Sequence, residues 1–508
     1  MAHGTATDLS DDGLIQKFTV LLSAPRELWI VYFGKVMETA AYALFNAGLM
    51  LYLINDLRFS DEGAGFFVGL WAVMISFFTF LVGSLSDAIG IRKTLIFSFT
   101  LCAITRGLTA VLGDPILAPV LGLVPMSLGV AMTIPVMVAA ARRFTNKRQR
   151  SMGFALLYVM MNVGFAIAGK LYDKVRNWMG EEGTFVIPGV GIELSVYETI
   201  FLIAAAFTVV GLVPCMAFMR EGVEMPEEGD EVTFDTSAQA PAEGGPIRQA
   251  GQILKKTGAI LAEVFREKAF YRFLLFLTIV VGVRMVFYHM HYTLPPWADR
   301  ELGYGSRFGT AWGVLNPVMI IGLTPLVGAL FSRVSSYRMI IVGTSVCALS
   351  CFLLVLPIDT FAFLVPTGAS GPVKWFLDID GDLAPLYFTL LIFAAAFSVG
   401  EALWSPRLYQ YTASVAPKGR EATYMGLSLL PMFFAKFIVG PMSGVLLGLY
   451  CPAEGARQSS NLWLVVAVMA VASPVLIMAL RKFIAADSDE EEDLVPASGA
   501  DGDEEVTP

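Results

Sequence analysis

Long apolar segments separated by short polar turns make up most of the chain. A helix needs about 20 mostly apolar residues to cross a bilayer, and twelve segments reach that length. The predicted spans are residues 28–54, 63–83, 94–113, 117–141, 151–171, 197–219, 270–293, 308–331, 338–357, 385–410, 423–449 and 461–483. The pattern therefore predicts an all-α membrane protein with twelve transmembrane helices.

Polar segments divide these helices into two sets of six. The segment between spans six and seven opens with a Pro- and Gly-rich acidic stretch and ends in Ile247–Glu267, where apolar residues recur at helical spacing. We expect a linker with an amphipathic helix on the membrane surface. The acidic C-terminal tail has too few large apolar residues to offset the entropy of ordering, so we expect it to be disordered. The predicted domains are an N-terminal segment (1–27), an N-terminal six-helix bundle (28–219), the linker (220–268), a C-terminal six-helix bundle (269–484) and the tail (485–508).

Composition and loop charges place the protein in a membrane and orient it. The chain is 56% hydrophobic and 16% charged, whereas soluble domains average about 25% charged residues. Lys and Arg gather in short loops on one side of the predicted spans, as in Arg142–Arg150, which predicts that both termini are cytoplasmic. Two longer segments, Tyr172–Val196 and Pro357–Leu383, are expected to cap the other side. The location is a cell membrane, the inner membrane in a Gram-negative source.

The turn after the second span carries the motif G-x-x-x-D-x-x-G-x-R-K. Gly83 permits close helix packing, Gly90 permits a tight reversal, and Asp87 is expected to face Arg92 across the turn, where charges complement helix termini. The motif resembles the signature loop between helices 2 and 3 of the major facilitator superfamily. The resemblance implies the major facilitator fold of two six-helix bundles and a gating role for these four residues.

Ionisable residues at membrane depth are costly, which makes each one a candidate for function. Span 1 has a Lys and a Glu three residues apart, with a Tyr one turn further on, and span 7 has an Arg with a Tyr and a His on its face. Span 10 has a Glu beside a Trp and a Ser, and span 11 has a central Lys. We expect Arg106, near a span end, to extend toward the interface instead. The solute-binding candidates are Lys35, Glu38, Tyr42, Arg284, Tyr288, His291, Glu401, Trp404, Ser405 and Lys436.

Spans 10 and 11 contain a second motif, GEALWSPRLYQYTASVAPKGREATYMGL. It resembles the proton-coupled oligopeptide transporter family, whose tenth helix carries G-E-x-x-x-S-P. YVMMNVG in span 5 and NPVMIIGLTP in span 8 are also similar to that family. The resemblance implies that Glu401 holds a substrate ammonium group. It also implies a pocket lined by Tyr158, Asn162, Asn316, Trp404 and Ser405.

Two departures from that family concern basic residues. Its first helix has E-x-x-E-R, where this chain has Lys35, Glu38 and Thr39, and its fourth helix has a Lys before a Pro, where this chain has Ile134. Leaving aside residues at span ends, four of the six intramembrane charges are basic and two are acidic. This balance favours a zwitterionic or anionic solute.

The sequence thus predicts a secondary transporter that works by alternating access, with Glu38 and Glu401 as proton carriers. Proton symport is feasible because each charge crossing the membrane supplies about 2.3 kcal/mol per 100 mV. The sequence contains no P-loop motif, which argues against a pump driven by nucleotide hydrolysis. An organic-anion or amino-acid carrier, a drug or metabolite exporter and a membrane nutrient sensor remain alternatives. We expect no catalytic site, metal, cofactor or nucleic-acid partner. The expected partners are a small solute, protons and membrane lipids, with the chain a monomer.

Overall fold

The computed structural model describes residues 19–226, 232–234, 268–331, 334–415 and 430–480. Eleven helices in this part of the chain are long and apolar enough to cross a membrane, and α17 (Leu430–Tyr450) adds a further apolar helix. The prediction of an all-α membrane protein is therefore confirmed. The predicted amphipathic helix and the acidic tail lie outside the described residues, so both stay predictions.

The first half of the chain forms six long helices that follow the predicted spans. Gly90, with φ of 89°, separates the second from the third. A capping box starts the sixth, where Ser195 and Glu198 each bind the other's backbone amide. The elements are α2 (Arg26–Leu51) with η2 (Tyr52–Asp56), α3 (Asp61–Ile89), α4 (Ile91–Leu112), η3 (Ala118–Leu123) with α5 (Val124–Arg143), α6 (Arg150–Met179), and α7 (Val196–Ala217). Strands β1 (Phe185–Val186) and β2 (Glu193–Leu194) pair between α6 and α7, and β3 (Val223–Glu224) pairs with β4 (Thr233–Phe234) after α7.

The second half follows the predicted spans with one break. The predicted span 308–331 is divided at Trp312–Val314, because the ring of Pro317 conflicts with the helical carbonyl four residues earlier, at Gly313. The elements are α9 (Lys268–Tyr292), α10 (Leu294–Leu302), α11 (Phe308–Ala311), α12 (Leu315–Leu330), α13 (Ser336–Ser350) with η5 (Cys351–Leu353), η6 (Ala362–Leu364), α14 (Ser370–Leu377), α15 (Leu386–Val415), α17, and α18 (Ser459–Ala479).

Several helices of each half pack on one another, whereas α3 and α17 make their most extensive contact across the halves. In the first half α2 packs on α6 and α7, and α4 on α5 and α7; in the second, α13 packs on α15 and α18, and α9 on α17 and α18. The halves meet where α3 crosses α17 and where α6 contacts α11 and α12. The predicted domains and their boundaries stay predictions.

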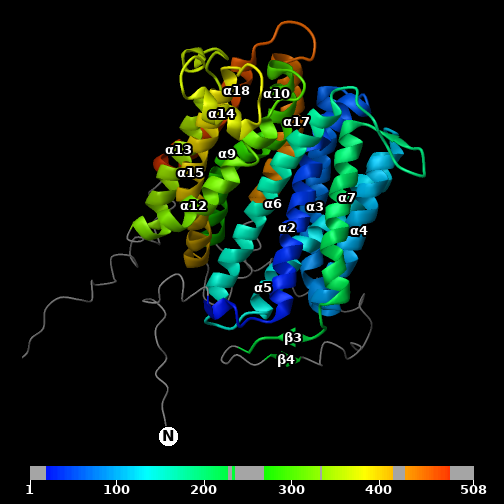
Figure 1. Cartoon of the computed structure of the whole chain (residues 1–508). Helices are drawn as coiled ribbons and strands as arrows, with labels where there is room; N and C mark the ends of the chain where they lie inside the picture. Colours follow the sequence, from blue (N-terminus) through cyan, green and yellow to red (C-terminus); the bar gives the residue numbers. More distant parts are fainter. Residues whose placement is uncertain (1–18, 227–231, 235–267, 332–333, 416–429, 481–508) are drawn as a thin grey trace, which may run out of the picture.

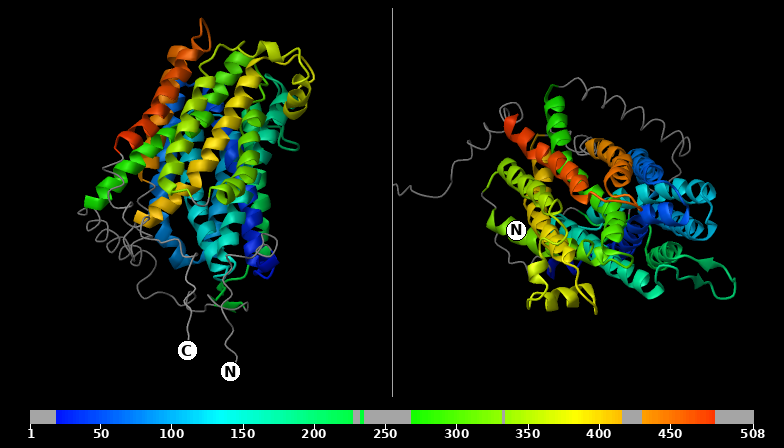
Figure 2. Two further views of the ribbon diagram at one scale, coloured as in Figure 1. Left: turned by 90° about the vertical axis from the view of Figure 1, so that its left-hand side faces the viewer. Right: turned by 90° about the horizontal axis from the view of Figure 1, so that it is seen from above.

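The helix ends define two faces. We call the end with the β3–β4 hairpin and the Gly90 turn the linker face, and the end with α10 and α14 the far face (Figure 1). The start of α2 lies at the linker face, and α18 begins at the far face and runs in the direction of the linker face (Figures 1 and 2). That this face is cytoplasmic stays a prediction.

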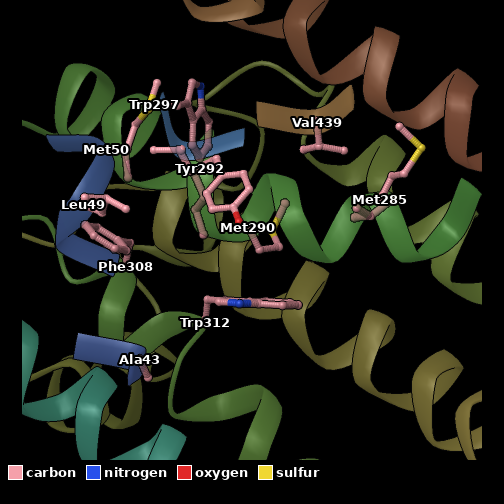
Figure 3. Packing of buried hydrophobic residues seen from close by; sticks show 14 of the residues in the cluster. Ala43, Leu49, Met50, Met285, Met290, Tyr292, Trp297, Phe308, Trp312 and Val439 are labelled. Carbon is pink, nitrogen blue, oxygen red and sulfur yellow. The ribbon is translucent and has the colours of Figure 1, made fainter. Parts of the chain in front are cut away.

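The far face is packed with apolar side chains from both halves. Leu49 and Met50 of α2 lie near Tyr292 at the end of α9, Trp297 of α10 and Phe308 of α11 (Figure 3). All five are buried within one hydrophobic cluster. Glycines allow the halves to approach closely, since a Cβ on Gly65 of α3 would lie 2.5 Å from the carbonyl oxygen of Gly440 on α17. The halves are therefore in close contact at this end.

Candidate functional site

Glu401 of α15, a helix that packs on α12 and α13, is buried. Its Oε2 accepts a hydrogen bond of 2.9 Å from the side-chain amide of Asn316 on α12. The same amide donates to the hydroxyl of Ser398, also at 2.9 Å. Ser398 lies one turn before Glu401, so Asn316 fixes both side chains across the α12–α15 contact. Sequence analysis selected Glu401 and Asn316 and missed Ser398, which has no distinguishing pattern.

Arg284 of α9 lies beside Glu401. Its guanidinium carbon is 5.1 Å from the ring centroid of Phe287 and 5.8 Å from that of Trp404. Arg284 and Glu401 interact electrostatically, although no ion pair to Glu401 forms among the described residues. Trp404 and Ser405 are both buried next to Glu401 on α15. The structure therefore brings together the predicted residues of spans 7, 8 and 10.

A second group lies where α2, α9 and α17 meet. The ammonium of Lys436 on α17 is 5.7 Å from the ring centroid of Tyr288 on α9. Tyr42 of α2 interacts electrostatically with both Lys436 and Tyr288, and His291, whose Nδ1 lies 2.8 Å from the carbonyl oxygen of Phe287, interacts with Lys436 as well. Both halves of the chain thus contribute to this group.

A third group is confined to the first half. Arg106 of α4 forms two hydrogen bonds to Glu38 of α2, at 2.6 and 2.8 Å, and a third to Thr208 of α7. The side chain of Arg106 is fully buried and that of Glu38 is 6% exposed. The prediction that Arg106 extends to the interface was wrong, because a buried carboxylate and a hydroxyl satisfy it inside the bundle. Lys35 forms no ion pair among the described residues and interacts electrostatically with Glu38.

Two predicted pocket residues lie on α6. The side-chain amide of Asn162 donates to the backbone carbonyl of Tyr158 at 2.9 Å, which is a bond within the helix. Gly164 has a clear packing role, because a Cβ there would lie 2.8 Å from the carbonyl oxygen of Val36 on α2. Among the described residues, no hydrogen bond links Asn162 to Glu401. A role of Tyr158 and Asn162 in binding solute stays a prediction.

The predicted gate lies at the linker face. Gly90 makes the turn, whereas the side chain of Asp87 on α3 lies outside the described residues. Arg92 forms an ion pair of 3.3 Å with Glu221 and donates to the carbonyl oxygen of Met216. Lys93 also contacts Glu221, at 3.7 Å. Arg92 thus joins α4 to the start of the linker, and its pairing with Asp87 stays a prediction, as does a gating role for Gly83.

Sequence analysis missed a set of polar contacts that joins the halves at the far face. Asp173 of α6 accepts hydrogen bonds from the backbone amides of Gly309 and Thr310, and Arg176 of α6 pairs with Asp299 at 2.5 Å. The prediction that a cap begins at Tyr172 was wrong for Tyr172–Met179, which is helical. The three-residue spacing of Asp173 and Arg176 was the available signal, since it places both on one helical face.

A second ion pair closes the other side of the far face. Arg300 of α10 donates to both carboxylate oxygens of Asp61 on α3, at 2.6 and 2.9 Å. The side chains of Arg300 and Asp61 are only 9% and 13% exposed. Arg176, in turn, has the rings of Tyr172, Tyr304 and Phe308 within 5.5 Å. These partly desolvated pairs hold the halves together at one end of the molecule.

Comparisons with known proteins agree with this architecture. A family model for the Major Facilitator Superfamily matches residues 31–377. Dipeptide and tripeptide permease B of Salmonella typhimurium is 22% identical over 444 residues, covering 83% of this chain and 87% of the permease. The permease of the same name from Aliivibrio fischeri is 20% identical over 435 residues, covering 83% of this chain and 86% of its own.

Solved structures show the same fold. A POT family transporter in complex with 5-aminolevulinic acid matches with a TM-score of 0.64 and 15% identity, covering 91% of this chain and 99% of that one. A POT family transporter in complex with a thioalcohol-conjugated peptide matches with a TM-score of 0.63, 15% identity and the same coverage. The predicted major facilitator fold is thereby confirmed.

Proposed function

This chain belongs to the Major Facilitator Superfamily, and we propose that it is a proton-coupled secondary transporter of a small zwitterionic or anionic solute, such as a short peptide or an amino acid. It is a multi-pass membrane protein. The proposal includes alternating access, in which the two sets of helices move relative to one another and expose the residues between them to each side in turn.

The observation that carries the proposal is the arrangement of interior charge. Glu401 is buried with a neutral partner, Asn316, and forms no ion pair among the described residues. A carboxylate in such a place either takes a proton or attracts a cation. Lys436 lies on α17 of the same half, over the ring of Tyr288 on α9, and Arg284, also on α9, lies over the ring of Trp404 beside Glu401. Opposite charges about one helical turn apart along α9 suit a solute with opposite charges of its own.

The two predicted proton carriers differ in their surroundings. Glu38 is held in place by two charge-assisted hydrogen bonds from Arg106. Glu401 accepts a hydrogen bond from an amide and has Arg284 only in its vicinity. We therefore propose Glu401 as the principal proton carrier, and Glu38 as a residue that positions α2 against α4.

The relatives support the choice of solute class. The permeases of Salmonella typhimurium and Aliivibrio fischeri are named for dipeptides and tripeptides. One POT family structure holds 5-aminolevulinic acid, a small molecule with an amine and a carboxylic acid. The excess of interior basic residues over acidic ones favours an organic-anion carrier as the second candidate.

Transport by proteoliposomes tests the proposal. Purified full-length protein would be reconstituted. Counterflow of radiolabelled dialanine would be followed in vesicles loaded with unlabelled dialanine, and net uptake in unloaded vesicles with and without an inward proton gradient. We expect counterflow without a gradient, and accumulation in the unloaded vesicles only with the gradient. Binding of a dipeptide without counterflow would contradict a transporter and favour the sensor. Counterflow of simple dicarboxylates but not of dialanine would favour the anion carrier.

A further inference from the structure

We propose that Lys436, Tyr42 and Tyr288 form a site for the carboxylate group of the solute. The proposal rests on the function proposed above and assigns one end of the solute to a named group of side chains. The three residues come from α17, α2 and α9, so the site spans both halves of the chain.

The first step in the argument is the charge of Lys436. It lies within an apolar helix, and among the described residues its contact partner is the ring of Tyr288, 5.7 Å away. A cation–π contact with one tyrosine compensates only part of the cost of placing an ammonium group at membrane depth. An anion bound beside Lys436 completes the compensation.

The second step is that the protein itself supplies no such anion among the described residues. Both oxygens of Glu38 are bound by Arg106. Glu401 is held by Asn316 on the α12 side of α15. Within the part of the chain that the structure describes, the counter-charge for Lys436 is thus left to a bound molecule.

The third step is the hydroxyl of Tyr42. Its ring stacks on Trp71, with centroids 6.1 Å apart, which orients the side chain. The hydroxyl makes no hydrogen bond to the described residues, although it lies close enough to Lys436 and Tyr288 for electrostatic interaction. A phenol and an ammonium group both donate hydrogen bonds, and together they suit the two oxygens of a carboxylate.

The fourth step is access and spacing. Tyr42, Tyr288 and Lys436 each keep part of their surface accessible, whereas Tyr292 and Val439, further toward the far face, are buried in the apolar cluster (Figure 3). Arg284, beside Glu401, lies one turn before Tyr288 on α9, a rise of about 6 Å. One residue of extended chain spans about 3.5 Å. The offset along α9 between the group around Glu401 and the group around Lys436 thus fits the length of one or two extended residues, that is, an amino acid or a dipeptide.

Matched probes that differ only at their ends test this site. Calorimetry on the purified full-length protein would compare dialanine, its C-terminal amide and N-acetyl dialanine. We expect the wild type to bind dialanine at least about tenfold more tightly than the amide, because a hydrogen bond to a charged group is lost. In K436Q, affinity for dialanine should fall to that of the amide, while affinity for the amide stays unchanged. Y42F should lose part of the preference, and K436R should keep it.

Controls separate loss of the site from loss of the fold or of transport. K174Q removes an exposed lysine at the far end of α6 and should leave the preference intact, and melting curves should show that K436Q remains folded. Wild-type preference in K436Q, or no preference in the wild type, overturns the site even if dialanine is transported. Binding of carboxylates that depends on Lys436, without counterflow, supports the site and contradicts the transport function. Failure of every carboxylate probe to bind the wild type overturns the site.

Discussion

Arg106 of α4 and Glu38 of α2 form a bidentate ion pair inside the first half of the chain, with N–O distances of 2.6 and 2.8 Å. Thr208 of α7 also contacts Arg106. Three helices are thus joined by one buried polar group at membrane depth. A pair of this kind gives the bundle a fixed register, because any other arrangement of these helices leaves a charge without a partner.

We predict that breaking this pair destabilises the protein strongly. E38Q and R106M should each lose about 3–5 kcal/mol of unfolding free energy, because each leaves its partner buried without compensation. The double variant E38Q/R106M should lose less than the sum. Unfolding of the four proteins in mixed micelles measures the coupling. Additive losses would contradict a direct interaction.

The far-face ion pairs give a second prediction. D61N and D299N should each shift the molecule toward a state in which the far face is open, because each removes a partly desolvated link between the halves. Spin labels at Trp178 on α6 and Trp375 on α14, both exposed, would report the shift as a longer distance by pulsed electron resonance. E454Q, at an exposed residue of the same face, is the control and should leave the distance distribution unchanged. An unaltered distribution in D61N/D299N would show that these pairs do not hold the far face closed.

Glu401 provides the third prediction. If it carries the coupled proton, E401Q should abolish accumulation of solute while exchange across the membrane persists, because exchange needs no net proton movement. Uptake into unloaded proteoliposomes measures accumulation, and counterflow into proteoliposomes loaded with solute measures exchange. Wild-type accumulation by a folded E401Q protein would refute the assignment. Loss of both activities, restricted to solutes with an amine, would instead place the substrate ammonium at Glu401.

The fourth prediction concerns the Gly90 turn. D87N should slow transport and leave solute affinity nearly unchanged, since we expect Asp87 to stabilise one state of the transport cycle. E221Q, which removes the partner of Arg92 and Lys93, should cost at most about 1 kcal/mol of stability, as for other ion pairs near the surface. Transport rates, calorimetry and unfolding measure these effects. A large rise in the dissociation constant of D87N would count against a gating role.

The sequence by itself determined the membrane class, the number and approximate limits of the spans, and the superfamily. These follow from apolar runs of membrane length and from the motif around Gly83–Arg92, which are both local properties. It also selected Glu401 and Asn316 as site residues, because a charged or amide side chain at membrane depth is conspicuous in an apolar segment.

Only the tertiary structure decided which charges are partners. Arg106 lies 68 residues from Glu38, and Arg300 lies 239 residues from Asp61. Sequence analysis named Glu38 with Lys35 as solute-binding candidates of span 1 and Glu38 as a proton carrier, whereas the structure pairs Glu38 with Arg106. The physical reason is that a buried carboxylate is most stable where its hydrogen bonds are best satisfied. An arginine with two parallel donors satisfies a carboxylate better than a lysine on the same helix. Which helices bring such groups together depends on packing across the whole bundle, and no local pattern encodes it.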